Sequence, residues 1–109
     1  MKNRVKDLFS YPKGYLEVDE TLLRKLGVNP AVLFAAIIQQ ARTSEEETFQ
    51  FEAREIEKMT GIKKKRQQTA IKTLKDLGLI KCEKKGSALF FKIDNECYCN
   101  YKNLVLNDE

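Results

Sequence analysis

Apolar residues recur at helical spacing in four segments of the chain and alternate with polar residues in three others. The helical spacing predicts helices over 20–26, 29–41, Ala53–Met59 and Lys63–Leu77. The alternating spacing predicts strands at Thr48–Phe51, Leu79–Lys84 and Ala88–Ile93. Because only Lys85-Gly86-Ser87 separates the last two strands, we expect them to form a β-hairpin.

Residues with specific backbone preferences mark where these helices begin and end. Asp19 is a good N-cap for the first helix, while Asn29-Pro30 offers the second an N-cap followed by proline at its first position. Glycine, which readily adopts left-handed backbone angles, follows three of the helices, at Gly27, Gly61 and Gly78. These signals agree with the boundaries that the apolar spacing predicts.

The second helix and the two ends of the chain leave alternatives open. Apolar residues cover much of the helix circumference between Val32 and Ile38, so this helix lies either at the centre of the core or against another subunit. Tyr15–Val18 is either a short strand or an extended arm. Asn95–Leu106 is either a final helix or an extended tail.

The order of the predicted elements defines a fold class. It is helix, helix, strand, helix, helix, strand, strand, and a helix–turn–helix followed by a β-hairpin is the winged-helix arrangement. We therefore expect an α+β, mainly α, winged helix-turn-helix fold with a small antiparallel sheet and a wing hairpin at 79–93. The expected division is a lead-in at 1–14, the winged-helix domain at 15–94 and a C-terminal helix or tail at 95–109.

Positive charge is concentrated in one segment of the chain. Residues 63–86 hold nine lysines and arginines against Asp76 and Glu83, for a net charge of +7. The whole chain carries +4, so the remainder carries −3. Such an asymmetry suits an anionic partner bound on one side of the protein.

The predicted helix at Lys63–Leu77 has a basic face opposite its apolar stripe. Amide and hydroxyl groups lie among the lysines there, and Lys and Gln side chains can contact phosphates and base edges in a DNA major groove. Lys84 and Lys85 lie at the hairpin tip, where they can reach an adjacent phosphate or the minor groove. The simpler alternative is a solvated basic helix face that binds nothing. The candidate DNA-contacting residues are Lys63, Lys64, Lys65, Gln68, Thr69, Lys72, Lys84 and Lys85.

Other kinds of site have little support in the sequence. The chain has no histidine, and Cys82, Cys97 and Cys99 do not have the spacing of a zinc site. We expect Cys82 to face the core beneath the wing, and the other two to lie in a tail strand or at a subunit contact. We predict no enzyme activity, metal, cofactor or small-molecule substrate, because no general base, ligand set or phosphate-binding loop is recognisable. The N-terminus lacks a signal peptide and the longest apolar run, Ala31–Ile38, is too short to span a bilayer, so we expect a cytoplasmic protein without membrane contact.

The stretch EIEKMTGIKKKRQQTAIKTLKDLGLIKCEKKGSALFFKI (Glu55–Ile93) resembles the winged-helix domains of phage and plasmid replication proteins. These include replisome-organiser proteins and the N-terminal domain of DnaD-type primosome proteins. Tyr15–Gln39 resembles the arm and two helices that come before the first strand in the same group. The resemblance implies the winged-helix fold and the same eight DNA-contacting positions.

Two residues depart from the pattern that the resemblance implies. Many winged helices carry Ser or Thr where Lys63 stands, and a lysine cannot accept the hydrogen bond of an N-cap. Many also carry an aliphatic residue where Gln67 stands. Because the helical angle of Gln67 lies near the core side, we expect its amide to bond a backbone group rather than to read a base.

Two functions are compatible with these observations. The first is binding of double-stranded DNA in phage, plasmid or bacterial replication initiation or in gene regulation, with lysines on phosphates and Gln68, Thr69 and Lys64 or Lys65 on bases. The second is a protein-interaction module, with little DNA affinity, that forms a homodimer or docks to a replication protein. The arm at Tyr15–Val18 and the apolar helix around Val32–Ile38 would form its interface. DnaD-type domains, which the chain resembles, are associated with oligomerisation.

Overall fold

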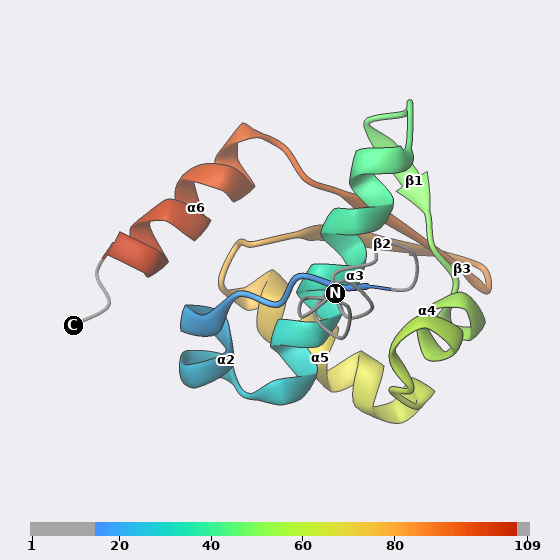
Figure 1. Cartoon of the computed structure of the whole chain (residues 1–109). Helices are drawn as coiled ribbons and strands as arrows, with labels where there is room; N and C mark the ends of the chain where they lie inside the picture. Colours follow the sequence, from blue (N-terminus) through green and yellow to red (C-terminus); the bar gives the residue numbers. More distant parts are fainter. Residues whose placement is uncertain (1–14, 107–109) are drawn as a thin grey trace, which may run out of the picture.

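A computed structural model of the chain describes residues 15–106, so the lead-in predicted at 1–14 lies outside the described residues. Figure 1 shows an α+β arrangement that is mainly helical, as the spacing of apolar residues predicts. Within residues 15–106, no helix combines the length and the apolar character needed to cross a bilayer. The elements in chain order are α2 (Glu20–Leu26), α3 (Val28–Thr43), β1 (Thr48–Gln50), α4 (Ala53–Thr60), α5 (Lys64–Asp76), β2 (Lys81–Lys85), β3 (Ala88–Lys92) and α6 (Asn95–Leu106).

The start of α2 confirms one predicted cap, and the start of α3 overturns another. Asp19 accepts a hydrogen bond from the Leu22 backbone N–H at 3.0 Å. The predicted Asn29 cap is wrong, because α3 already begins at Val28, directly after Gly27. Gly27 has a φ of 97°, which glycine tolerates, so the chain turns from one helix into the next within a single residue. Pro30 still fits, because the first N–H groups of a helix need no partner within it.

Helix α3 forms the centre of the core. Six of its residues are buried, and the helix packs against α2, α4 and α5. The core that surrounds it includes Leu22 of α2, Ile56 of α4 and Leu74 of α5. Of the two alternatives for this helix, the central position is therefore the one observed, and its apolar circumference is accounted for by contacts within the chain.

The three strands form one antiparallel sheet in the order β1-β3-β2. Phe91 of β3 lies opposite Phe49 of β1 on one side and Cys82 of β2 on the other, so a row of apolar residues faces the core. Strand β2 begins two residues later than predicted. Leu79 and Ile80 are buried in the connection from α5, and the Leu79 N–H donates to the Leu74 carbonyl at 3.0 Å, which closes the end of α5.

The two ends of the described chain adopt one of their predicted alternatives each. Tyr15–Val18 forms no strand, and Glu17 in this arm pairs with Arg42 of α3 at 3.4 Å. Residues Asn95–Leu106 form the helix α6, whose first turn is capped by Asp94, which accepts from the Cys97 N–H at 3.1 Å. A tail strand for Cys97 and Cys99 is therefore wrong, because both lie in this helix.

Candidate functional site

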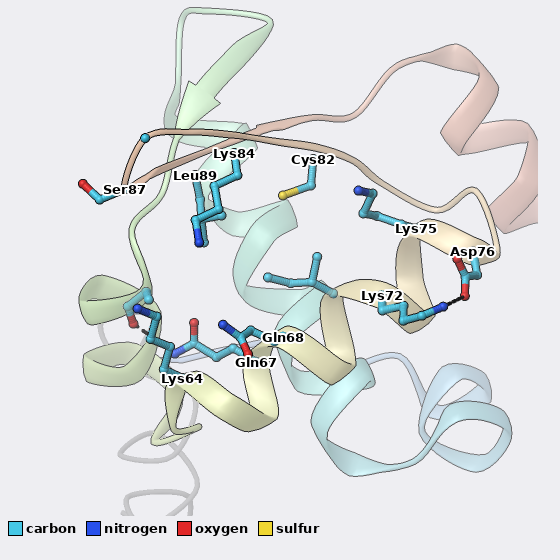
Figure 2. A pocket seen from close by; sticks show the side chains of 13 residues that line it. Lys64, Gln67, Gln68, Lys72, Lys75, Asp76, Cys82, Lys84, Ser87 and Leu89 are labelled. Carbon is cyan, nitrogen blue, oxygen red and sulfur yellow. Dashed lines mark hydrogen bonds and ion pairs between the residues drawn. The ribbon is translucent and has the colours of Figure 1, made fainter.

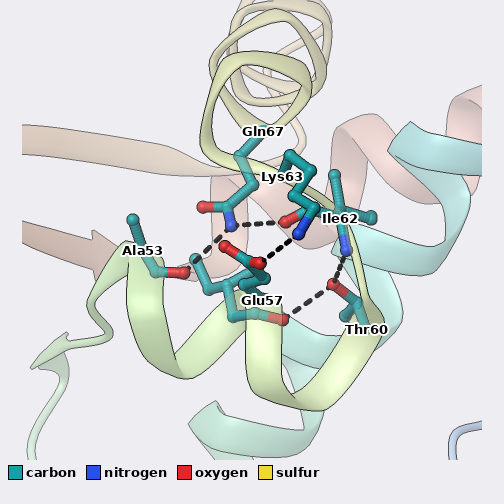
Figure 3. Close-up of polar contacts among 7 residues, drawn as sticks. Ala53, Glu57, Thr60, Ile62, Lys63 and Gln67 are labelled. Carbon is teal, nitrogen blue, oxygen red and sulfur yellow. Dashed lines mark hydrogen bonds and ion pairs between the residues drawn. The ribbon is translucent and has the colours of Figure 1, made fainter.

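Helices α4 and α5 are joined by a tight turn that fixes the start of α5. Gly61 follows α4 with a left-handed φ of 79°, as predicted. The Thr60 hydroxyl donates to the Ile56 carbonyl at 2.7 Å and accepts from the Ile62 N–H at 3.1 Å (Figure 3). Ile62 is buried, so the turn is anchored in the core and α5 leaves it in a defined direction.

The first turn of α5 concentrates positive charge at the positive end of the helix dipole. Lys63 is the N-cap residue and its side chain makes no capping hydrogen bond, as predicted for a lysine. Its ammonium instead pairs with the Glu57 carboxylate at 2.9 Å (Figure 3). The first turn contains no acidic residue, so Lys64, Lys65 and Arg66 stand beside backbone N–H groups that also favour an anion.

The buried side chain of Gln67 connects α5 to α4 and to the turn between them. Its side chain is 1% exposed, and its Nε2 donates to the Ala53 carbonyl at 3.0 Å and to the Ile62 carbonyl at 2.8 Å (Figure 3). The expectation that its amide bonds backbone groups is confirmed. Gln67 therefore positions the N-terminal end of α5.

A groove of about 650 Å³ lies between α5 and the β2–β3 hairpin (Figure 2). The lining includes the mainly apolar side chains of Ile71, Cys82 and Leu89. We call it the α5–hairpin groove, and the residues that line it are Ala53, Lys64, Gln67, Gln68, Ile71, Lys72, Lys75, Asp76, Cys82, Lys84, Gly86, Ser87 and Leu89.

The rim of the α5–hairpin groove is basic. It holds four lysines and one aspartate, for a formal charge of +3. The aspartate, Asp76, pairs with Lys72 at 2.9 Å, and both side chains are mainly exposed, so water screens this pair. Figure 2 shows Lys84 pointing from the hairpin toward α5. Two consecutive elements, α5 and the β2–β3 hairpin, thus present ammonium groups to one concave surface.

Half of the predicted DNA-contacting residues line this groove. They are Lys64, Gln68, Lys72 and Lys84. Lys65 and Thr69 lie on the other flank of α5, in a shallower hollow beside the α2–α3 junction. Lys63 is held by Glu57 at the edge of the turn. The eight residues therefore do not form one surface.

Lys85 lies on the opposite face of the hairpin from Lys84. Neighbouring residues of a strand point to opposite faces, and Lys84 lines the groove. The ammonium of Lys85 lies 5.5 Å from the centre of the Phe90 ring and 3.8 Å from the Glu83 carboxylate. A ligand seated in the groove would not contact it.

Lys75 and Ser87 are among the lining residues that the sequence had not assigned to a site. Lys75 flanks the basic face on the helical projection, and Ser87 belongs to the hairpin turn. Helical spacing centres the basic face of α5 directly opposite its apolar stripe. The hairpin packs to one side of that face. Lys75 lies at nearly the same angle around the axis of α5 as Lys64 and Gln68. This angle identifies Lys75 once the side of α5 that faces the hairpin is known.

The groove includes the thiol of Cys82. Burial raises the pKa of the Cys82 thiol, and the nearby Lys75 only partly opposes this, so the thiol stays protonated at neutral pH. Cys97 is buried in α6 and Cys99 is exposed on it. Among the described residues, no three Cys, Asp or Glu side chains gather in a way that could hold a metal ion.

No family model, curated protein or solved structure matches this chain.

Proposed function

We propose that this chain is a winged helix-turn-helix domain that binds double-stranded DNA through α5 and the β2–β3 hairpin. One observation carries the proposal: Lys64, Lys72 and Lys84 converge on one concave face from two separate elements. Ammonium groups gathered on one face suit the phosphates of a backbone, which supply most of the affinity of proteins for DNA. Gln68 lies among them and can bond an adenine edge.

The order of the elements along the chain supports the winged helix-turn-helix fold in this proposal. Along the chain the β2–β3 hairpin follows directly after α5, and α4 and α5 are joined through Gly61. In winged helices the second helix of such a pair enters the major groove while the hairpin contacts the adjacent backbone. The process served is the regulation of genes or the initiation of replication, in a phage, plasmid or bacterial setting, as the resemblance implies.

The test is a titration of a fluorescent duplex at several salt concentrations, followed by anisotropy. Two matched variants, Lys84→Glu and Lys102→Glu, change the charge equally. Lys102 is exposed on α6, which lies away from the hairpin turn (Figure 1). We expect Lys84→Glu to weaken binding about tenfold and to reduce the salt slope by about one, and Lys102→Glu to do neither. Equal effects of both variants would mean that net charge alone attracts the DNA, and no binding at low salt would refute the proposal.

A protein-interaction role is the second candidate, and it rests on a different face. A cleft of about 460 Å³ lies between the arm, α3 and α6, and its lining is largely apolar. Tyr98 beside it is 57% exposed and Leu106 of α6 is 72% exposed. Exposed apolar surface of this kind is common where proteins meet. The cleft includes parts of both elements predicted for such an interface, the arm at Val18 and α3 at Phe34 and Ile38, and adds α6 to them.

Sedimentation over a range of concentrations tests this second role. We expect the wild type to associate and Tyr98→Asp to remain monomeric with unchanged circular dichroism. A wild type that is monomeric at every concentration would leave a homodimer without support. The same samples show whether association and DNA binding are separate properties.

A further inference from the structure

The Gln67 amide uses one of its two polar atoms and leaves the other without a partner. Its Nε2 donates to two backbone carbonyls, those of Ala53 and Ile62, which fixes the orientation of the amide. Oε1 is buried and accepts no hydrogen bond within the described residues. Figure 2 shows this oxygen pointing toward the hairpin, into the α5–hairpin groove that Gln67 lines. A buried acceptor without a donor is unfavourable, so a ligand gains by supplying an N–H once the atoms that cover Oε1 move aside.

The groove sets further conditions on such a ligand. Ile71 and Leu89 give it apolar walls, which favour a flat and weakly polar body. The lysines on the rim favour a negative charge at one end of that body. Its volume of about 650 Å³ falls within the range of roughly 300–1,000 Å³ that is typical of small-molecule sites.

We infer that the α5–hairpin groove binds a nucleotide whose base is unpaired. The ring lies between Ile71 and Leu89, an N–H of the base donates to Gln67 Oε1, and the phosphate pairs with Lys64 or Lys84. A base within an intact duplex stays in its stack and cannot insert its ring into the groove, so it must leave the stack to reach this oxygen. The inference rests on the proposed function in that DNA is the first source of such a nucleotide, and a free nucleotide is the second.

The first experiment compares three labelled duplexes of equal length with the wild-type protein. One is fully paired, one has a single extra unpaired adenine, and one has an abasic unit at that position. We expect the unpaired adenine to bind about tenfold more tightly than the other two, which corresponds to about 1.4 kcal/mol. The abasic duplex shares the bend and the phosphates of the second, so equal affinity for both overturns the inference.

The second experiment tests the hydrogen bond to Gln67. The extra adenine is replaced by purine, which has the same rings and lacks the amino group. We expect about a tenfold loss of affinity if the amino N–H donates to Gln67 Oε1. Equal affinity for adenine and purine overturns the inference, because Oε1 then serves no donor on the base. The protein is identical in every arm, so folding does not affect the comparison.

A third experiment separates this inference from the proposed function. Adenosine monophosphate is titrated into labelled protein, and the side-chain amide signal of Gln67 and the methyl signals of Leu89 are followed by NMR. Suppose that the paired duplex binds, that the adenine duplex binds no more tightly than the paired or abasic duplex, and that the free nucleotide moves none of these signals. The inference then fails and the proposed function stands. If no duplex binds but the free nucleotide moves these signals, the proposed function fails and the groove is a nucleotide site.

Discussion

The hydroxyl of Tyr101 donates a hydrogen bond to the carboxylate of Asp19, although 82 positions separate the two residues. The other carboxylate oxygen of Asp19 accepts from the Leu22 N–H and caps α2. The Tyr101 ring stacks on Phe34 of α3, with ring centres 5.9 Å apart. One carboxylate therefore both starts α2 and holds α6, so the two ends of the described chain depend on each other.

The first prediction removes the Tyr101 hydroxyl. We expect Tyr101→Phe to lower the free energy of unfolding by about 1 kcal/mol, because the ring contact with Phe34 is kept while one hydrogen bond to a charged group is lost. Urea denaturation measures the change. The matched variant Tyr98→Phe removes an exposed hydroxyl from the same helix and should leave the stability unchanged. Equal effects would mean that the bond contributes nothing.

The second prediction concerns acid stability. The pKa of Asp94 is well below its usual range, chiefly because of the Lys81 ammonium, 2.6 Å away, and also because of the Cys97 N–H. Burial raises the pKa of Asp19, but hydrogen bonds from Tyr101, Leu22 and Thr21 lower it further than burial raises it. A carboxyl with a depressed pKa stabilises the fold above its unfolded pKa of about 3.9 and ceases to do so as the pH falls through the folded value.

We therefore expect the stability to be constant near neutral pH and to decline below about pH 4. Denaturation at a series of pH values measures the decline. The variant Asp94→Asn should be less stable at neutral pH and should lose less on acidification. A wild-type curve that stays flat down to about pH 2 would contradict the assignment.

The third prediction compares two replacements of buried Gln67. Gln67→Leu loses the hydrogen bonds to Ala53 and Ile62 but also removes the unpartnered oxygen, so we expect a loss of only about 1 kcal/mol. Gln67→Glu keeps the shape and buries a carboxylate facing two carbonyls, so we expect a loss of more than about 3 kcal/mol. Thermal and urea unfolding measure both, and equal losses would show that this side chain is accessible to water.

The fourth prediction uses two glycines with left-handed backbone angles. Gly61 has a φ of 79° and open space where a Cβ would stand, whereas a Cβ on Gly78 would lie 2.5 Å from Asn100 Nδ2. That amide donates to the Gly78 carbonyl at 2.9 Å and helps to hold α6. We expect Gly61→Ala to destabilise by about 1 kcal/mol and Gly78→Ala by about 1 kcal/mol more. Similar losses in urea denaturation would argue against this contact.

The fifth prediction concerns the uncapped start of α5. Lys63→Ser supplies the missing N-cap and removes a positive charge from the helix N-terminus, at the loss of an exposed pair with Glu57. We expect a net gain of about 1 kcal/mol in stability. Lys65→Ser removes the same charge from the first turn but supplies no cap, so it should give a smaller gain in the same unfolding assay.

The fold could be predicted from the sequence largely because its local signals agree with its apolar spacing. Asp19, Gly61 and the alternation in β3 all mark the boundaries that the structure has. The N-cap predicted at Asn29 was wrong although the Asn-Pro pair is favourable for a helix start. The backbone angles of Gly27 allow α3 to begin earlier, at Val28. The predicted start of β2 at Leu79 was wrong, because Leu79 and Ile80 are apolar for another reason. They are buried in the connection that follows α5.

The candidate site was less predictable, because its shape depends on how two elements pack. Helical spacing alone gave the outer face of α5, and it grouped Lys65 with Lys64. The hairpin packs beside that face, so Lys64 and Gln68 share the groove with Lys84, while Lys65 lies on the other flank. The inward amide of Gln67 was predictable from its angle, but the carbonyls that it bonds were not.

The order β1-β3-β2 has a consequence for the behaviour of the protein at high concentration. Within residues 15–106, strand β2 is an edge of the sheet, so one row of its backbone N–H and C=O groups has no neighbouring strand there. Such edges recruit strands from other molecules unless charge prevents it, and lysines are the commonest protection. Lys81, Lys84 and Lys85 occupy three of the five positions of β2. Neutralising them would therefore remove a barrier to aggregation.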